Sequence, residues 1–313
     1  MNIDLNDEAR EYGRLARQAI ESAGGDALVQ RAEADPDRRE AVVSGVLDDL
    51  AVSELDPRGS GDELEAAAAL CRSAGWWAVP YPMAERLARP RDLDADGLVV
   101  VDERRPAGPL ASVGGRWVAV TLDGGRHEVT VRPSAGPRTS AYVADLDLRP
   151  LDAAGAGDVA LGLVLPCWTL LGMLDRALAL TSGYVVDRRQ FGKPLASFQG
   201  VQFQLTDAEV ERAGVEELAK YALWSVQADR PEALDDALAL RLAALEAAAV
   251  VFRVCHQLHG AIGFCDETTL SWLSRYSRPL RRLPWGPSGT LDRLARQIGR
   301  RGLTGLFSES EAR

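Results

Sequence analysis

Two short stretches combine arginine, amide and glycine residues in a way that suits a phosphate-bearing ligand. The first, "DRRQFGKPLASFQG", runs from Asp187 to Gly200. The second, "QLHGAIGF", begins at Gln257 and contains Gly260 and Gly263. Arginine guanidinium groups, amide side chains and unpaired backbone N–H groups can bind a pyrophosphate and a nucleotide by hydrogen bonds. Because each stretch interrupts or ends an apolar helical pattern, both are expected at helix ends.

Other stretches carry weaker chemical signals. "CHQLHG" contains Cys255, His256 and His259, but no third ligand cluster accompanies them, so no metal site is predicted. "SRYSRPLRR", residues 274–282, sets arginines beside aromatic residues. It could bind phosphate, or form a surface or a subunit contact. Each main stretch also has an interpretation that involves no ligand. Residues 187–200 could be a solvent-exposed turn, and residues 257–263 could be an ordinary helix end.

The elements that must position these residues follow from hydrophobic periodicity. Residues 1–93 show apolar residues at steps of three and four, which predicts an N-terminal helical domain. Residues 94–158 change to short runs of period two between Gly, Pro and Asp turns, which predicts a small β-domain. Residues 159–313 are helical again, with long patterns at 160–186, 199–227, 231–259 and 287–303. The fold is therefore predicted to be mainly α with a small β-domain.

Composition narrows the class of protein. The chain has 313 residues, 46% of them apolar, and a net charge of −10, which argues against nucleic acid as the main partner. Four widely spaced cysteines favour reduced thiols and a cytoplasmic location. The acidic, amphipathic N-terminus is no signal peptide, and no apolar run is expected to reach membrane-spanning length.

Taken together, the two glycine-containing stretches resemble the C-terminal helical domain of the acyl-CoA dehydrogenase family. The resemblance implies an N-terminal helical domain, a reduced middle β-domain and a C-terminal four-helix bundle. It also implies FAD as cofactor, with the adenosine pyrophosphate arm contacted across a dimer interface, from the neighbouring subunit. The residues implied to contact FAD are Arg188, Phe191, Gln199, Gln257, Gly260 and Ala261. Family members commonly have two glycines where this chain has Gly260 and Ala261.

The chain departs from the family where the catalytic base should stand. The commonest position corresponds to "LPWGPSGT", residues 283–290, which holds no carboxylate. The alternative is the Glu of a Glu-Arg pair, which falls here on Gly162 and Leu163. The lost arginine of that pair also removes a residue implied to help hold CoA. Residues 97–158 lack the Thr-Glu-Pro-type loop that lies against the flavin ring in the family. No catalytic residue is therefore predicted.

These losses predict a shortened, non-catalytic subunit similar to those of heteromeric (α2β2) acyl-CoA dehydrogenases of steroid catabolism. A homologous catalytic subunit would supply the base, bind most of the acyl-CoA and form a heterotetramer with fewer flavins than subunits. Neither nucleic acid nor a membrane is an expected partner. Two alternatives stay open. The chain could be a complete acyl-CoA dehydrogenase with a displaced base, or a flavin-free scaffold. Candidates for a displaced base are Glu246, Asp266 and Glu267.

Overall fold

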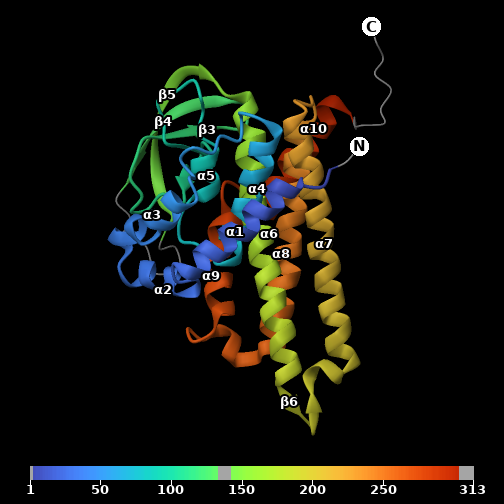
Figure 1. The fold of residues 1–313 in the computed structure, drawn as a ribbon. Coiled ribbons are helices and arrows are strands. Elements are labelled where there is room, and N and C mark those ends of the chain that lie inside the picture. The colour runs from blue at the N-terminus through green and yellow to red at the C-terminus, as the bar shows by residue number, and fades with distance from the viewer. Residues whose placement is uncertain (1–2, 133–141, 303–313) are drawn as a thin grey trace.

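Two helical regions flank a small β-sheet in the computed structural model, which describes residues 3–132 and 142–302 (Figure 1). The prediction of a mainly α protein with a small β-domain is confirmed. The predicted boundaries at residues 93 and 158 stay a prediction, and residues 303–313 of the predicted C-terminal domain lie outside the described residues.

The N-terminal region is helical, and side chains cap its two longest helices. Asn6 accepts a hydrogen bond from the Ala9 N–H at 2.7 Å, and Ser60 accepts one from the Glu63 N–H at 3.2 Å. Such caps satisfy amide groups that a helix start leaves free. The elements are α1 (Asp7–Ser22), α2 (Asp26–Ala34), the 3₁₀ turn η1 (Pro36–Arg38), α3 (Arg39–Asp49), α4 (Gly61–Trp76) and α5 (Met83–Leu87).

The sheet follows in the order β1-β3-β4-β5-β2. Strands β1 and β3 pair in parallel, and the other neighbours are antiparallel. Both β1 and β3 are buried along their whole length, whereas β5 alternates buried and exposed residues at its start. The strands are β1 (Gly97–Val100), β2 (Ala107–Gly108), β3 (Trp117–Val120), β4 (Gly125–Val131) and β5 (Ala144–Ala154).

The C-terminal region is a bundle of long helices that pack against one another. The elements are α6 (Ala156–Asp187), the hairpin strands β6 (Arg189–Gln190) and β7 (Lys193–Pro194), η3 (Leu195–Ser197), α7 (Gln199–Gln227), α8 (Ala233–His259), η4 (Gly260–Phe264), α9 (Thr269–Arg282) and α10 (Pro287–Arg301). The sequence patterns do not predict α9. The helix has a buried face made by Leu270, Leu273 and Tyr276. Its polar composition and its internal Pro279 make this face hard to recognise from the sequence.

Helix α6 is the central core helix. By length and composition it could cross a membrane, so the expectation that no apolar stretch is long enough is wrong. Its most apolar window is 83% buried inside the fold, as in a core helix. Helix α4 crosses it very closely, because a Cβ at Gly75 would lie 1.9 Å from the Thr169 carbonyl oxygen. A Cβ at Gly172 would likewise lie 1.9 Å from the Arg72 carbonyl oxygen, so both positions need glycine.

A buried ion cluster ties the start of α6 to the two regions before it. Asp158, in the first turn of α6, is 2% exposed. Arg126 from β4 donates to it at 2.7 Å, and Arg58, just before α4, lies 2.8 Å away. One carboxylate therefore links the N-terminal helices, the sheet and the bundle.

Candidate functional site

The connection between α6 and α7 is a tight β-hairpin with an exposed aromatic residue at its tip. Arg189 pairs with Pro194, and Gln190 pairs with Lys193. The two residues between them, Phe191 and Gly192, have φ values of +51° and +80°. Positive φ at both central residues is the pattern of a type I′ hairpin turn. Phe191 is 92% exposed, which is unusual for a large apolar residue. Its positive φ is also uncommon for a residue other than glycine.

Helix α8 ends beside this hairpin. Gly260 caps the helix with φ +68°, a left-handed conformation that favours glycine. The Tyr184 ring, near the end of α6, stacks on His259 with centroids 4.4 Å apart. The Tyr184 hydroxyl also donates to the His259 carbonyl at 3.4 Å. These contacts hold the ends of α6 and α8 together, at the lower end of the bundle in Figure 1.

The fold therefore brings both predicted stretches to one end of the bundle. We call the six predicted residues the bundle-end surface: Arg188, Phe191, Gln199, Gln257, Gly260 and Ala261. All six are exposed. Within residues 3–132 and 142–302, no side-chain hydrogen bond or ion pair engages Arg188, Gln199 or Gln257. Their polar groups are thus free to contact a ligand or a partner.

Exposed apolar side chains surround the bundle-end surface. Val186 on α6 and Phe203 on α7 are each 59% exposed, and Phe264 after α8 is 67% exposed. His256 stacks on the Phe264 ring with centroids 4.3 Å apart. Apolar groups gathered around free polar ones are typical of a protein–protein contact.

The two histidines of "CHQLHG" belong to two separate aromatic stacks, His259 on Tyr184 and His256 on Phe264. The His259 Nδ1 lies 2.9 Å from the Cys255 carbonyl oxygen. Burial lowers the pKa of both imidazoles, so they are neutral at pH 7. Among the described residues no group of three potential ligands could hold a metal ion.

Neither family position for the catalytic base holds a carboxylate. A Cβ at Gly162 would lie 2.7 Å from Val100 Cγ2, so a side chain there would require Val100 on strand β1 to shift. In the stretch 283–290, Trp285 is only 4% exposed and fills the space with an indole. Arg241, which is 2% exposed, donates to the carbonyl oxygens of Trp285 (2.8 Å) and Leu280 (3.3 Å) and fixes this stretch.

A carboxylate that the sequence patterns did not single out lies between these two positions. Glu85 on α5 lines a small central cavity of about 30 Å³. Gly162 and Leu163 form one wall of this cavity, and Leu283 and Pro284 form another. Of the described residues that line it, Glu85 alone carries a carboxylate. Burial raises the pKa of Glu85 to about 7. No sequence motif marks Glu85, because its setting depends on distant elements that meet only in the fold.

The displaced-base candidates named from sequence lie elsewhere. Glu246 on α8, Asp266 and Glu267 are all exposed. Asp266 forms an ion pair with Arg275 at 2.8 Å. None of the three lines the central cavity. The arginine run at residues 274–282 makes up most of α9, and its Arg281 lies over the buried Phe252 ring.

Comparison with known proteins finds similarity in the C-terminal half of the chain. Residues 163–303 match the acyl-CoA dehydrogenase C-terminal domain. The acyl-CoA dehydrogenase FadE28 of Mycobacterium tuberculosis is 36% identical over 125 residues, which cover 39% of this chain and 36% of that protein. The 3-sulfinopropanoyl-CoA desulfinase of Paraburkholderia xenovorans is 33% identical over 156 residues, 49% of this chain and 36% of that protein. The matched region thus spans about a third of these curated relatives.

Solved structures extend the likeness to the whole fold. A chain of the Tcur3481-Tcur3483 steroid ACAD G363A variant aligns with a TM-score of 0.79 and 20% identity, covering 95% of this chain and 99% of that one. A chain of the ChsE4-ChsE5 complex from Mycobacterium tuberculosis aligns with a TM-score of 0.78 and 18% identity, covering 97% and 100%. At such identities the likeness establishes the fold alone.

Proposed function

We propose that the chain is a subunit of an FAD-dependent acyl-CoA dehydrogenase, because residues 163–303 match the acyl-CoA dehydrogenase C-terminal domain. Its bundle-end surface completes the FAD site of a homologous catalytic partner, which supplies the base and binds most of the acyl-CoA. When bound, FAD would supply hydride acceptance. The residues that would hold its pyrophosphate arm are those of the bundle-end surface, and the partner's base would take the α-proton of the substrate. A steroid-derived acyl group, a cytoplasmic location and a heterotetramer follow by analogy with the family.

The observation that carries this proposal is the position of the two predicted stretches. Arg188 and Gln199 on one stretch and Gln257 on the other are exposed at one end of the bundle, with α6 and α8 held together by the Tyr184–His259 stack. Free guanidinium and amide groups fit the pyrophosphate arm of a flavin presented from outside. The apolar side chains around them fit the surface of the partner that presents it.

The two vacant base positions support a role without a base. A Cβ at Gly162 would crowd the Val100 side chain, and buried Trp285 stands in the stretch of the commonest base position. The names of the two similar structures, Tcur3481-Tcur3483 and ChsE4-ChsE5, each join two proteins, and the first is a steroid ACAD. A two-component assembly for this chain agrees with that pattern.

Flavin content tests the proposal directly. The chain purified alone should carry little FAD, and the chain co-expressed with a full-length homologue should form a complex with fewer than one FAD per chain. Flavin absorbance, with protein quantified in the same sample, measures both. A flavin-saturated homodimer would overturn the half-site proposal. Absence of flavin from the co-purified complex would favour the scaffold alternative.

The central cavity favours a second candidate function, a dehydrogenase that has its own displaced base. Glu85 lies between both vacant base positions, and its pKa of about 7 suits proton transfer near neutral pH. It is better placed for this role than Glu246, Asp266 or Glu267, which are exposed.

Turnover of the assembled enzyme separates the two functions. If the partner supplies the base, Glu85→Gln should retain turnover, and so should Glu246→Gln, Asp266→Asn and Glu267→Gln. Removal of a positioned general base usually costs about 10²–10⁴-fold in rate. A loss of that size in Glu85→Gln, with flavin content and assembly intact, would make this subunit catalytic. The same loss in one of the other three variants would place the base there.

A further inference from the structure

A row of arginines lies along α9, in the stretch at residues 274–282 that the proposed function does not use. Arg278, Arg281 and Arg282 are three and four residues apart, so they share one face of the helix. The buried side chains of Leu273 and Tyr276 lie on the opposite face. We call these three arginines the α9 trio.

The α9 trio has no carboxylate partner in the part of the chain that the structure describes. Within residues 3–132 and 142–302, no hydrogen bond or ion pair engages any of its three guanidinium groups. Arg275, one turn earlier on α9, is by contrast paired with Asp266 at 2.8 Å. The trio therefore keeps its N–H donors for contacts outside the described chain.

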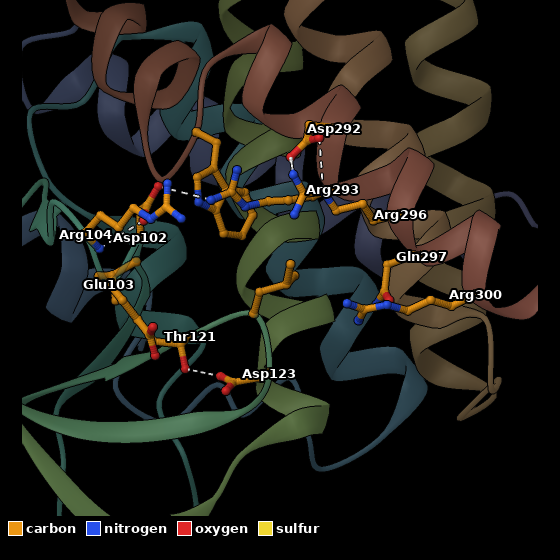
Figure 2. A pocket seen from close by; sticks show the side chains of 13 residues that line it. Asp102, Glu103, Arg104, Thr121, Asp123, Asp292, Arg293, Arg296, Gln297 and Arg300 are labelled. Atoms are coloured by element: carbon orange, nitrogen blue, oxygen red, sulfur yellow. Dashed lines mark hydrogen bonds and ion pairs between the residues drawn. The ribbon is translucent and has the colours of Figure 1, made fainter.

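Arginines on the neighbouring helix α10 show the usual arrangement. Arg293 forms an ion pair with Asp102 at 3.1 Å, and Arg296 forms one with Asp292 at 3.0 Å (Figure 2). The chain has a net charge of −10, so carboxylates are in excess. A row of arginines that meets none of them among the described residues is therefore not a consequence of composition.

The three guanidinium groups of the trio repel one another. Burial lowers the pKa of the half-buried Arg281, and the positive charges of Arg278 and Arg282 lower it further. The negative end of the helix dipole offsets part of this repulsion, because Arg281 and Arg282 lie in the last turn. It gives their N–H donors no acceptors, so folding alone does not account for the trio.

Arg281 connects the trio to the bundle-end surface. Its guanidinium lies over the Phe252 ring of α8, 5.5 Å from the ring centroid. Burial, and after it the charges of His259 and Arg281, lower the pKa of His256, one turn further along α8. His256 directly precedes Gln257 and stacks on the exposed Phe264. The trio thus borders the side of the molecule that the proposed function assigns to a partner.

We propose that the α9 trio binds an acidic segment of a protein partner, which the proposed function, on which this inference rests, identifies as the catalytic subunit. Carboxylates spaced along such a segment pair with guanidinium groups spaced along the helix, through charge-assisted hydrogen bonds. The net charge of −10 on the whole chain disfavours an anionic membrane or a nucleic acid as the occupant. The contact orients the partner and makes assembly depend on salt.

A fluorescein-labelled hexaglutamate peptide tests the trio on the purified chain, without a partner. Fluorescence anisotropy should show saturable binding that weakens as salt is added, because salt screens exposed charges. Arg281→Gln and Arg282→Gln should each raise the dissociation constant, by about tenfold for the half-buried Arg281 and by less for Arg282. Arg105→Gln, which removes an exposed arginine from the loop after β1, is the matched control and should leave binding unchanged.

The complex with a co-expressed full-length homologue extends the test to the partner. The double variant Arg281→Gln, Arg282→Gln should raise the dissociation constant of the complex by about tenfold or more. Flavin per assembled complex should stay as in the wild type, because the trio is not among the proposed FAD contacts. Size-exclusion chromatography at several dilutions, with flavin absorbance, measures both.

Melting curves verify that each variant is folded, and Arg282→Gln should fold normally because Arg282 is exposed. Three results would overturn the proposal: no saturable peptide binding, binding that Arg281→Gln and Arg282→Gln leave unchanged, or an equal loss in Arg105→Gln. Binding to vesicles of phosphatidylcholine and phosphatidylserine, but not to the peptide, would also overturn it. Peptide binding through the trio, without assembly with a homologue, would support an acidic-peptide site while overturning the half-site function.

Discussion

Phe191 is a residue that folding alone does not explain. A bulky side chain at φ +51° is strained, and a phenylalanine that is 92% exposed gains little from burial in the isolated chain. Its ring meets Phe198 edge-on at 6.3 Å, a contact that leaves most of it in solvent. The backbone strain and the exposure of Phe191 are both explained if the hairpin tip is covered by a partner and its flavin, as the proposed function requires.

Arg188 and Arg189 offer a paired test at the residue scale. Both are exposed on the same hairpin, but Arg188 lies three residues before Phe191, the spacing used in the family. Arg188→Ala should therefore raise the dissociation constant for FAD in the heteromer roughly tenfold or more, since a charge-assisted hydrogen bond contributes about 1.5–3 kcal/mol. Arg189→Ala is the control and should change it much less. Equilibrium loss of flavin on dilution measures both, and equal effects would contradict the assigned register.

At the scale of elements, the long helices were predictable because each carries an uninterrupted apolar pattern. The predicted patterns at 199–227 and 231–259 correspond closely to α7 and α8. Within α8, Leu238, Leu245 and Phe252 are buried, whereas Ala249 is exposed. Helix α9 was missed, because its buried face alternates with arginines and serines. In α8 and α9, packing against neighbouring elements sets which residues are buried.

The cluster around Asp158 gives a prediction about how the elements are joined. Asp158→Ala would leave Arg126, which is 6% exposed, with Asp92 as its remaining ion-pair partner in the described chain, and would remove the carboxylate beside Arg58. Breaking a buried pair from one side typically costs about 3–5 kcal/mol. The free energy of unfolding, measured by denaturant titration, should fall by that order.

The exposed pair between Arg132 and Asp147 is the matched control, because both side chains are 55% exposed. Asp147→Ala should lower the free energy of unfolding far less than Asp158→Ala does, because water screens an exposed pair. If the two variants lost similar stability, Asp158 would not be the link between the three regions.

For the whole molecule, sequence could locate the bundle-end surface but not the central cavity. The bundle-end residues lie in two compact stretches, so their spacing along the chain carries the signal. Glu85 shares its cavity with residues of β1, α6 and α8, which are far apart in sequence. Its surroundings therefore appear only when the N-terminal helices, the sheet and the bundle are assembled.

Because Glu85 lies where the three regions meet, it should make the stability of the whole fold depend on pH. Its pKa is raised from 4.5 to about 7 in the folded chain. The folded state therefore keeps a proton that the unfolded state releases between these values. The stability that this proton provides is complete below pH 4.5 and is lost as pH rises through 7.

Glu85→Gln isolates this contribution, because its amide stays neutral at every pH. The difference in unfolding free energy, variant minus wild type, should become more positive by up to about 3 kcal/mol between pH 4.5 and pH 8, at 1.36 kcal/mol per pKa unit. Denaturant titrations at several pH values measure it. Glu246→Gln, at an exposed position, should leave the wild-type pH dependence in place. A difference for Glu85→Gln that stays constant with pH would mean that the Glu85 carboxyl ionises in the fold as freely as in water.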